Sequence, residues 1–130
     1  QRLDKFVTQR HILQKRYDSL LHDLAIIKPY QDQDSYSALH LYPIQVDLDS
    51  IDKNRQQIFD ELRQSGIGVN VHYIPIHTQP YYKNLGFKIG DFVKSESYYK
   101  ATISIPLSSS LTLKEQDKVV TSLIKSLSNY

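Results

Sequence analysis

The order of two kinds of hydrophobic pattern constrains the fold of this chain more than any other feature of its sequence. Three long segments repeat apolar residues with the period of a helix, and three short segments alternate apolar and polar residues with the period of a strand. The predicted order is helix, strand, helix, strand, an irregular segment with a short helix, strand and helix. This order predicts an α+β two-layer sandwich, with a small, mostly antiparallel three-stranded sheet that carries helices on one face.

The helices have identifiable ends. The first is predicted over residues 1–24, and the second is expected to begin at a cap formed by Asp49 or Ser50 and to stop at Gly66. Glycine at that position can take the left-handed conformation in which many helices end. The second half of the chain contains a short helix predicted over residues 92–100.

The last helix carries the strongest local signal in the chain. Thr112 and Glu115 have the spacing of a capping box, in which each side chain binds the other residue's backbone. Asp91 is placed to cap the preceding short helix in a simpler way. The residues that follow the capping box give the last helix one apolar face: Val119, Val120, Leu123, Ile124 and Leu127.

Three short strands are expected, at residues 37–48, 69–73 and 102–105. Pro43 lies in the first of them and has no backbone N–H to donate, so this strand is expected at an edge of the sheet or bulged near its middle. Residues 26–36 have the composition of a loop.

Length and composition indicate one globular domain over residues 1–130, and they exclude several classes. The charge of +2 comes from 16 basic and 14 acidic residues spread along the chain, which argues against a nucleic-acid partner. No apolar run approaches the roughly 18 residues of a membrane span. With no cysteine, there are no disulfides or thiolate zinc sites, which suits a soluble, cytoplasmic protein. The absence of methionine suggests that Gln1 is an internal residue of a longer protein.

The best candidate for a functional site is the stretch of residues 66–82, GIGVNVHYIPIHTQPYY. After a helix stop and a short strand, it gathers polar aromatic residues and imidazoles among two prolines: His72, Tyr73, His77, Tyr81 and Tyr82. Loops that carry function are held by rigid scaffolds in this way. A tyrosine-rich loop that only covers its own core fits the same residues equally well.

Other reactive patterns are weaker. The spacing of His40, His72 and His77 matches no zinc motif, and no pair of carboxylate ligands lies nearby. The serines at residues 108–110 lack the flanking glycines of a nucleophile elbow. No catalytic residue or metal ligand is therefore expected, and the stretch is suited to hold a substrate by stacking and hydrogen bonding.

Three segments resemble, in order and spacing, the C-terminal part of the DegT-like nucleotide-sugar aminotransferases. They are SALHLYPIQVD, RQQIFDELRQSGIGVNVHYIPIHTQPYY and GDFVKSESYYKATISIPLSSSLTLKEQDKVV. Leu39 departs from the alanine or tryptophan that is usual in this pattern, and Val93 stands where a proline is expected. These departures bear on the identity of the substrate and leave the resemblance intact.

The resemblance implies a pyridoxal-phosphate enzyme whose large N-terminal domain carries the cofactor and the Schiff-base lysine. This chain would be the small C-terminal domain, and because none of its lysines matches that motif it is expected to be inactive and to bind no cofactor alone. The parent would be a homodimer that moves an amino group from glutamate to a 4-keto nucleotide sugar, for surface polysaccharide or nonulosonic acid biosynthesis.

In such an enzyme the matching positions place His72, Tyr73 and His77 near the sugar-nucleotide site. The lack of an arginine after Pro106, where related enzymes bind an amino-acid carboxylate, agrees with a sugar substrate. The alternative hypothesis is a standalone α+β ligand-binding or regulatory module without catalysis.

Overall fold

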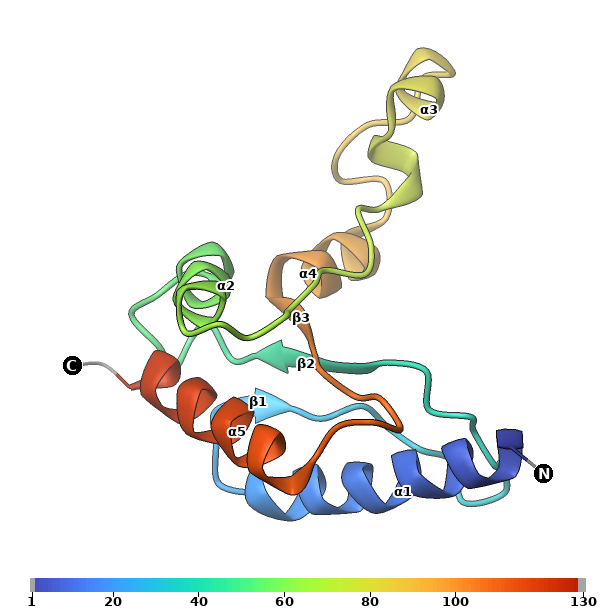
Figure 1. The fold of residues 1–130 in the computed structure, drawn as a ribbon. Coiled ribbons are helices and arrows are strands. Elements are labelled where there is room, and N and C mark those ends of the chain that lie inside the picture. Colours follow the sequence, from blue (N-terminus) through green and yellow to red (C-terminus); the bar gives the residue numbers. More distant parts are fainter. Residues whose placement is uncertain (1, 129–130) are drawn as a thin grey trace.

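A computed structural model describes residues 2–128 of the chain, which form a body of helices and sheet with an arm that points away from it (Figure 1). Along the chain the elements are α1 (Arg2–Leu20), β1 (Ile26–Ile27), β2 (Tyr42–Val46), α2 (Arg55–Gln64), the 3₁₀ helix η1 (Ile76–Thr78), α3 (Pro80–Asn84), α4 (Val93–Ala101), β3 (Thr102–Ile105) and α5 (Leu113–Leu127). No helix within residues 2–128 is both long and apolar enough to cross a membrane.

The sheet has three antiparallel strands in the order β1–β2–β3, which confirms the predicted sheet type. Two of the strand predictions were wrong in detail. Residues 69–73 contribute only an isolated bridge between Asn70 and Ser104, because the chain then leaves the body. The third strand is instead β1, which was predicted as loop because two residues are too short to show a period.

The strand predicted at residues 37–48 is shorter than expected and lies at the centre of the sheet. Leu39 has a φ of 50°, outside the extended region, and β2 begins only at Tyr42. Pro43 faces Ser104 of β3, whose backbone N–H and carbonyl both pair with Asn70 on the other side. The Pro43 nitrogen therefore points away from β3, on the side where β1 does not extend beyond Gln45. A central strand tolerates this proline because its edge is locally free.

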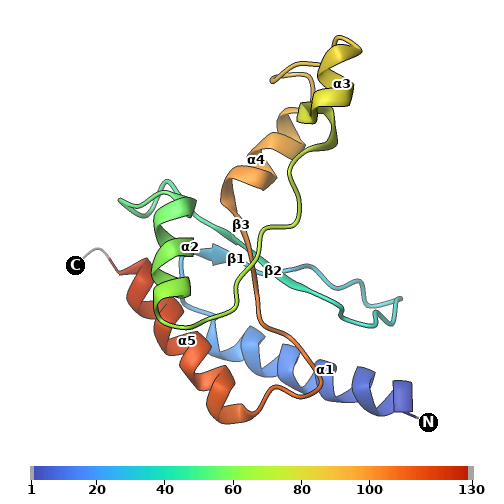
Figure 2. The ribbon, with the colours of Figure 1, turned by 45° about the horizontal axis from the view of Figure 1, so that its top comes forward.

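One hydrophobic core joins the sheet to α1, α2 and α5. Tyr42, Ile44 and Val46 alternate onto the same face of β2, and all three are buried. The three helices cover this face in Figures 1 and 2. The core residues that they contribute are Tyr17 and Leu21 from α1 and its end, Ile58 and Leu62 from α2, and Val119, Val120, Leu123 and Leu127 from α5. The predicted two-layer arrangement is therefore confirmed.

The helix ends test the predicted caps. The Thr112–Glu115 capping box of α5 is confirmed, whereas α2 begins four or five residues later than predicted, at a capping box formed by Asn54 and Gln57. α2 ends as expected at Gly66, whose φ is +75°. The backbone N–H of Ile67 then donates to the Leu62 carbonyl, which completes the hydrogen-bond pattern of a Schellman motif.

The caps predicted at Asp49 or Ser50 and at Asp91 were wrong, because local turns take up the polar groups there. The Asp49 N–H and the Ser50 hydroxyl donate to the Asp47 carboxylate, and the Asp91 carboxylate accepts from the Lys88 N–H, 2.9 Å away. The residue before α4 is Phe92, which makes no side-chain cap. A short polar side chain can satisfy a turn as well as a helix end, so sequence alone does not separate the two.

Two buried tyrosines attach α1 to the rest of the core. The Tyr17 hydroxyl donates to the Pro106 carbonyl at 2.9 Å, and the Tyr42 hydroxyl donates to Asp18 Oδ1 at 2.5 Å. Burial raises the pKa of both hydroxyls above their ordinary range, and the hydrogen bond to the Asp18 carboxylate raises that of Tyr42 further. Both side chains are therefore held in their neutral, donating form.

Candidate functional site

The candidate site lies on the arm, which we define as residues 74–92, and on the segment where the arm leaves the body. Figures 1 and 2 show the arm running outward from the end of the sheet and returning through α4 to β3. Every residue from 80 to 95 is exposed. The arm therefore contains the prolines and the short helix predicted for this stretch, but it does not cover the core of its own domain.

His72 and Tyr73 lie together where the arm begins, which we call the root of the arm. The Nδ1 atom of His72 is 2.9 Å from the hydroxyl of Ser104 in β3, and its ring meets the ring of Tyr73 edge to face with centroids 4.6 Å apart. The peptide bond between these two residues is cis, and the Tyr73 side chain is 71% exposed. Within residues 2–128, the second ring nitrogen of His72 has no hydrogen-bond partner, so it can donate to or accept from a bound molecule.

His77 lies further along, within the arm, and is only 6% exposed. Its Nε2 atom is 2.8 Å from Oε1 of Glu96, and the Gly90 backbone N–H donates to the same oxygen at 2.8 Å. Donation from Gly90 and then from His77 holds the pKa of the Glu96 carboxyl below its ordinary range. The three residues predicted for the site are thus divided between the root and the arm.

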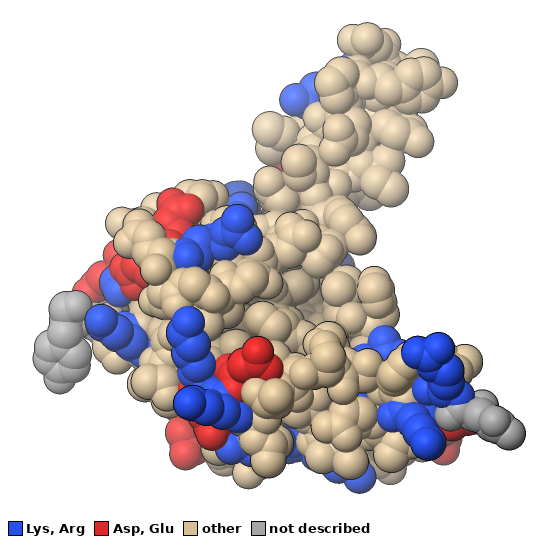
Figure 3. Space-filling model, viewed as in Figure 1, with Lys and Arg blue, Asp and Glu red and all other residues tan. Residues whose placement is uncertain are grey.

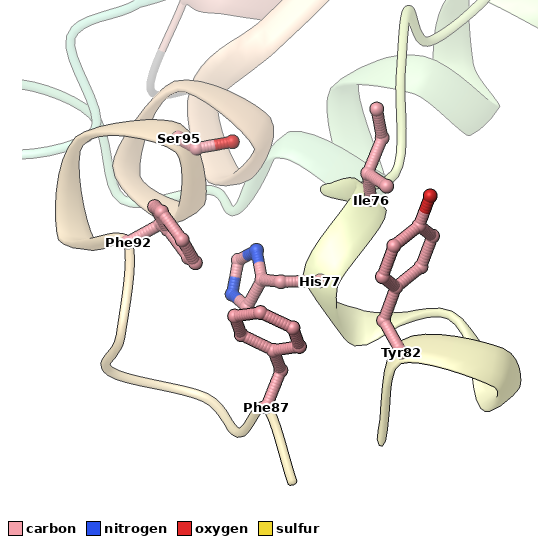
Figure 4. Close-up of a pocket in the computed structure, with 6 residues that line it drawn as sticks. All are labelled: Ile76, His77, Tyr82, Phe87, Phe92 and Ser95. Carbon is pink, nitrogen blue, oxygen red and sulfur yellow. The ribbon is translucent and has the colours of Figure 1, made fainter. Parts of the chain in front are cut away.

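Aromatic side chains surround His77 and form a hollow of about 280 Å³ (Figure 4). Its lining residues are Ile76, His77, Tyr82, Phe87, Phe92 and Ser95. The His77 ring lies between Phe92 and Phe87 in this view, with a centroid distance of 4.8 Å to Phe92. A hollow with these walls can hold an apolar or planar group by stacking and exclusion of water.

The sequence did not point to Glu96, Phe87 or Phe92 as part of this arrangement. His77 and Glu96 are 19 residues apart, and no local rule pairs side chains at that separation. The one available signal is that aromatic residues recur on both sides of the glycines at 86 and 90, which allow the chain to reverse with φ values of +100°.

On one face of the molecule, charged side chains are sparser over the arm than over the body. On the face seen in Figure 3, basic and acidic side chains lie over the body, and the arm is nearly free of them. Among the described residues, no group of three or more histidine, cysteine, aspartate or glutamate side chains could hold a metal ion.

The residues of the hollow do not fit pyridoxal phosphate. That cofactor needs a lysine amine for its aldehyde and cationic or N–H donors for its phosphate. None of the six residues that line the hollow is a lysine or an arginine. In the body, the Lys28 amine donates a hydrogen bond to the Asp18 carbonyl, and the Lys53 amine donates one to the Glu61 carboxylate. The hollow therefore offers neither an amine for the aldehyde of the cofactor nor a cationic side chain for its phosphate.

Comparison with known proteins shows which family this chain resembles. The model of the DegT/DnrJ/EryC1/StrS aminotransferase family matches residues 1–124. The spore coat polysaccharide biosynthesis protein SpsC of Bacillus subtilis is 35% identical over 122 residues, which are 92% of this chain and 31% of SpsC. A UDP-4-amino-4,6-dideoxy-N-acetyl-beta-L-altrosamine transaminase of Campylobacter jejuni is 35% identical over 79 residues, 61% of this chain and 20% of that protein.

A solved structure shows the same fold. Spr1654 from Streptococcus pneumoniae, in its apo-form, superposes with a TM-score of 0.86 at 29% identity and covers 96% of this chain and 31% of its own. The same protein has been solved in a PLP-form. The chain thus spans about a third of the length of SpsC and of Spr1654. With the family match extending over nearly all of its residues, this chain belongs to the DegT/DnrJ/EryC1/StrS aminotransferase family.

Proposed function

We propose that this chain is the small C-terminal domain of a pyridoxal-phosphate-dependent transaminase that moves an amino group from glutamate to a 4-keto nucleotide sugar. Membership of an aminotransferase family supports the reaction class. The name of the Campylobacter jejuni relative supports a nucleotide sugar as acceptor, and the likeness to SpsC supports a place in surface polysaccharide or nonulosonic acid biosynthesis.

In this proposal the arm and its root form one wall of the sugar-nucleotide site. The observation that carries this proposal is the position of the His72 imidazole beside the exposed ring of Tyr73. One ring nitrogen of His72 is hydrogen-bonded to Ser104, and the other has no partner within the described chain. His77 belongs to the same wall, further out along the arm. The Schiff-base lysine and the cofactor site belong to a large N-terminal domain outside this chain.

The rest of the sugar-nucleotide site would come from other parts of the parent enzyme. We propose that the parent is a cytoplasmic homodimer, in which apolar residues of the arm contact the large domain or the second subunit. The standalone binding or regulatory module is not favoured, because the aminotransferase family matches residues 1–124 as a whole.

The test uses the full-length enzyme, with glutamate and a 4-keto nucleotide sugar, and measures 2-oxoglutarate and amino-sugar formation. His72→Ala is expected to lower kcat/KM by about 10- to 100-fold, the value of one hydrogen bond to a charged or strongly polar partner. His22→Ala is the matched control, because His22 is an exposed histidine of the body that contacts Asp23. An enzyme that aminates no nucleotide sugar would exclude the proposed activity, and wild-type kinetics for His72→Ala would exclude this role of His72.

A further inference from the structure

Glu96 lies where three separate segments of the chain meet. It projects from α4, and one of its carboxylate oxygens accepts from the ring of His77 in η1 and from the backbone of Gly90 in the returning part of the arm. Both donors are 2.8 Å from that oxygen. The outgoing and returning parts of the arm are therefore joined through a single oxygen atom.

The arm has almost no hydrophobic core, so these hydrogen bonds are a main link between its two parts. Between residues 73 and 95, only Pro75 and His77 are buried, and the side chains of His77 and Glu96 are 6% and 15% exposed. The outgoing and returning parts of the arm are also linked by a backbone hydrogen bond from the Phe87 N–H to the Tyr82 carbonyl at 3.2 Å. Ring contacts add to it, between Tyr82 and Phe87 at 6.2 Å and between His77 and Phe92 at 4.8 Å. Hydrogen bonds that are largely shielded from solvent are electrostatically stronger than exposed ones.

The hydrogen bond to Glu96 also determines which ring nitrogen of His77 carries a proton. An ionised carboxylate can only accept hydrogen bonds, so Nε2 of His77 carries a proton and points at Glu96. This holds the ring of His77 against Phe92, 4.8 Å from its centroid, on the wall of the hollow seen in Figure 4. The shape of the hollow therefore depends on Glu96, which does not itself line it.

We propose that Glu96 is a positioning residue for the sugar-nucleotide wall, which acts by holding the His77 ring and the Gly90 backbone together. This inference rests on the proposed function for its kinetic consequence, but the structural role of Glu96 can be measured without it. The effect should fall on binding of the nucleotide sugar, and the steps that involve glutamate alone should be unchanged.

The experiment compares three variants of the full-length enzyme with the wild type. Glu96→Ala removes both hydrogen bonds, whereas Glu96→Gln keeps an oxygen that can accept both of them. Glu61→Ala removes a helical glutamate of the body that pairs with Lys53 at 3.0 Å, and serves as the matched control. Hydrogen–deuterium exchange is followed in peptides that cover residues 76–92, and KM and kcat are measured for each substrate.

Glu96→Ala is expected to speed exchange of these peptides at least about tenfold and to raise KM for the nucleotide sugar by about tenfold, with kcat and KM for glutamate within about twofold of the wild type. Glu96→Gln should restore both within about twofold, and Glu61→Ala should change neither. Unchanged exchange in Glu96→Ala, or faster exchange with an unchanged KM, would overturn the inference. If the wild type aminates no nucleotide sugar, the proposed function fails, and the exchange measurement still decides whether Glu96 holds the arm.

Discussion

The body and the arm use apolar residues in opposite ways. In the body, aliphatic and aromatic side chains from three helices and the sheet are buried against one another. In the arm, residues of the same types stay in solvent: Ile76 is 67% exposed, Leu85 61% and Ile89 75%. An apolar surface on this scale marks a place where a protein meets something else. The body thus buries its apolar residues in a core of its own, and the arm leaves apolar residues exposed within the described chain.

The sharpest test of this contrast compares two neighbouring residues of α5. Leu123 is fully buried and Ile124 is 44% exposed. Leu123→Ala is expected to lower the free energy of unfolding by about 2–5 kcal/mol, because it leaves a cavity in the core. Ile124→Ala should cost about 1 kcal/mol or less. Urea unfolding followed by circular dichroism measures both, and equal losses would show that the core boundary is misplaced.

A second test uses the buried tyrosines of the body. Burial raises the pKa of Tyr17 and Tyr42 above the ordinary value of about 10, so above that pH the unfolded chain loses their protons and the folded chain retains them. Their contribution to stability is complete below about pH 10, and it falls by about 1.4 kcal/mol per pH unit for each tyrosine above it.

Tyr42→Phe removes one of these groups and should make the alkaline loss of stability shallower, although the variant starts from a lower stability because the bond to Asp18 is gone. Tyr30→Phe is the control, since Tyr30 is 84% exposed. Melting temperatures between pH 8 and pH 11 (about one unit beyond the ordinary tyrosine pKa) provide the measurement. The same slope in Tyr42→Phe and in the wild type would mean that Tyr42 ionises freely in the folded chain.

The smallest effect is expected in the arm. Ile89→Ser should change the free energy of unfolding by about 0.5 kcal/mol or less, because the side chain is exposed in this chain and leaves no cavity. The measurement is the same urea titration as for Leu123→Ala. A loss of more than about 1 kcal/mol would show that the arm packs on the body, and the contrast between the two regions would be lost.

The parts of the fold that were predicted correctly depend on residues close together in the sequence. The Thr112–Glu115 capping box spans three residues, and Gly66 ends α2 through bonds that span at most five. The apolar faces of α2 and α5 follow from helical periodicity, except that Ile124, predicted on the face of α5, is 44% exposed. Errors arose where a local pattern had two solutions, as at Asp49, or was too short to have a period, as in β1.

For the site, the sequence indicated the stretch and tertiary structure supplied its partners. His72 and Tyr73 are neighbours in the chain, so their proximity needed no structure. The contacts that hold them and His77 were beyond sequence reasoning: Ser104 lies 32 residues from His72, and Glu96 lies 19 residues from His77. The chain between the members of each pair reverses its direction at Gly86 and Gly90. Which residues these turns bring together depends on tertiary packing.

By itself, the sequence determined the main helices, the α+β class with a mostly antiparallel sheet, the polar aromatic stretch and the family resemblance, because each of these depends on patterns over a few residues. Only the tertiary structure decided that Pro43 lies in a central strand, that the stretch becomes an arm outside the core, and that Glu96 joins its two sides. Those outcomes depend on which distant segments meet, and that is set by the packing of the whole chain.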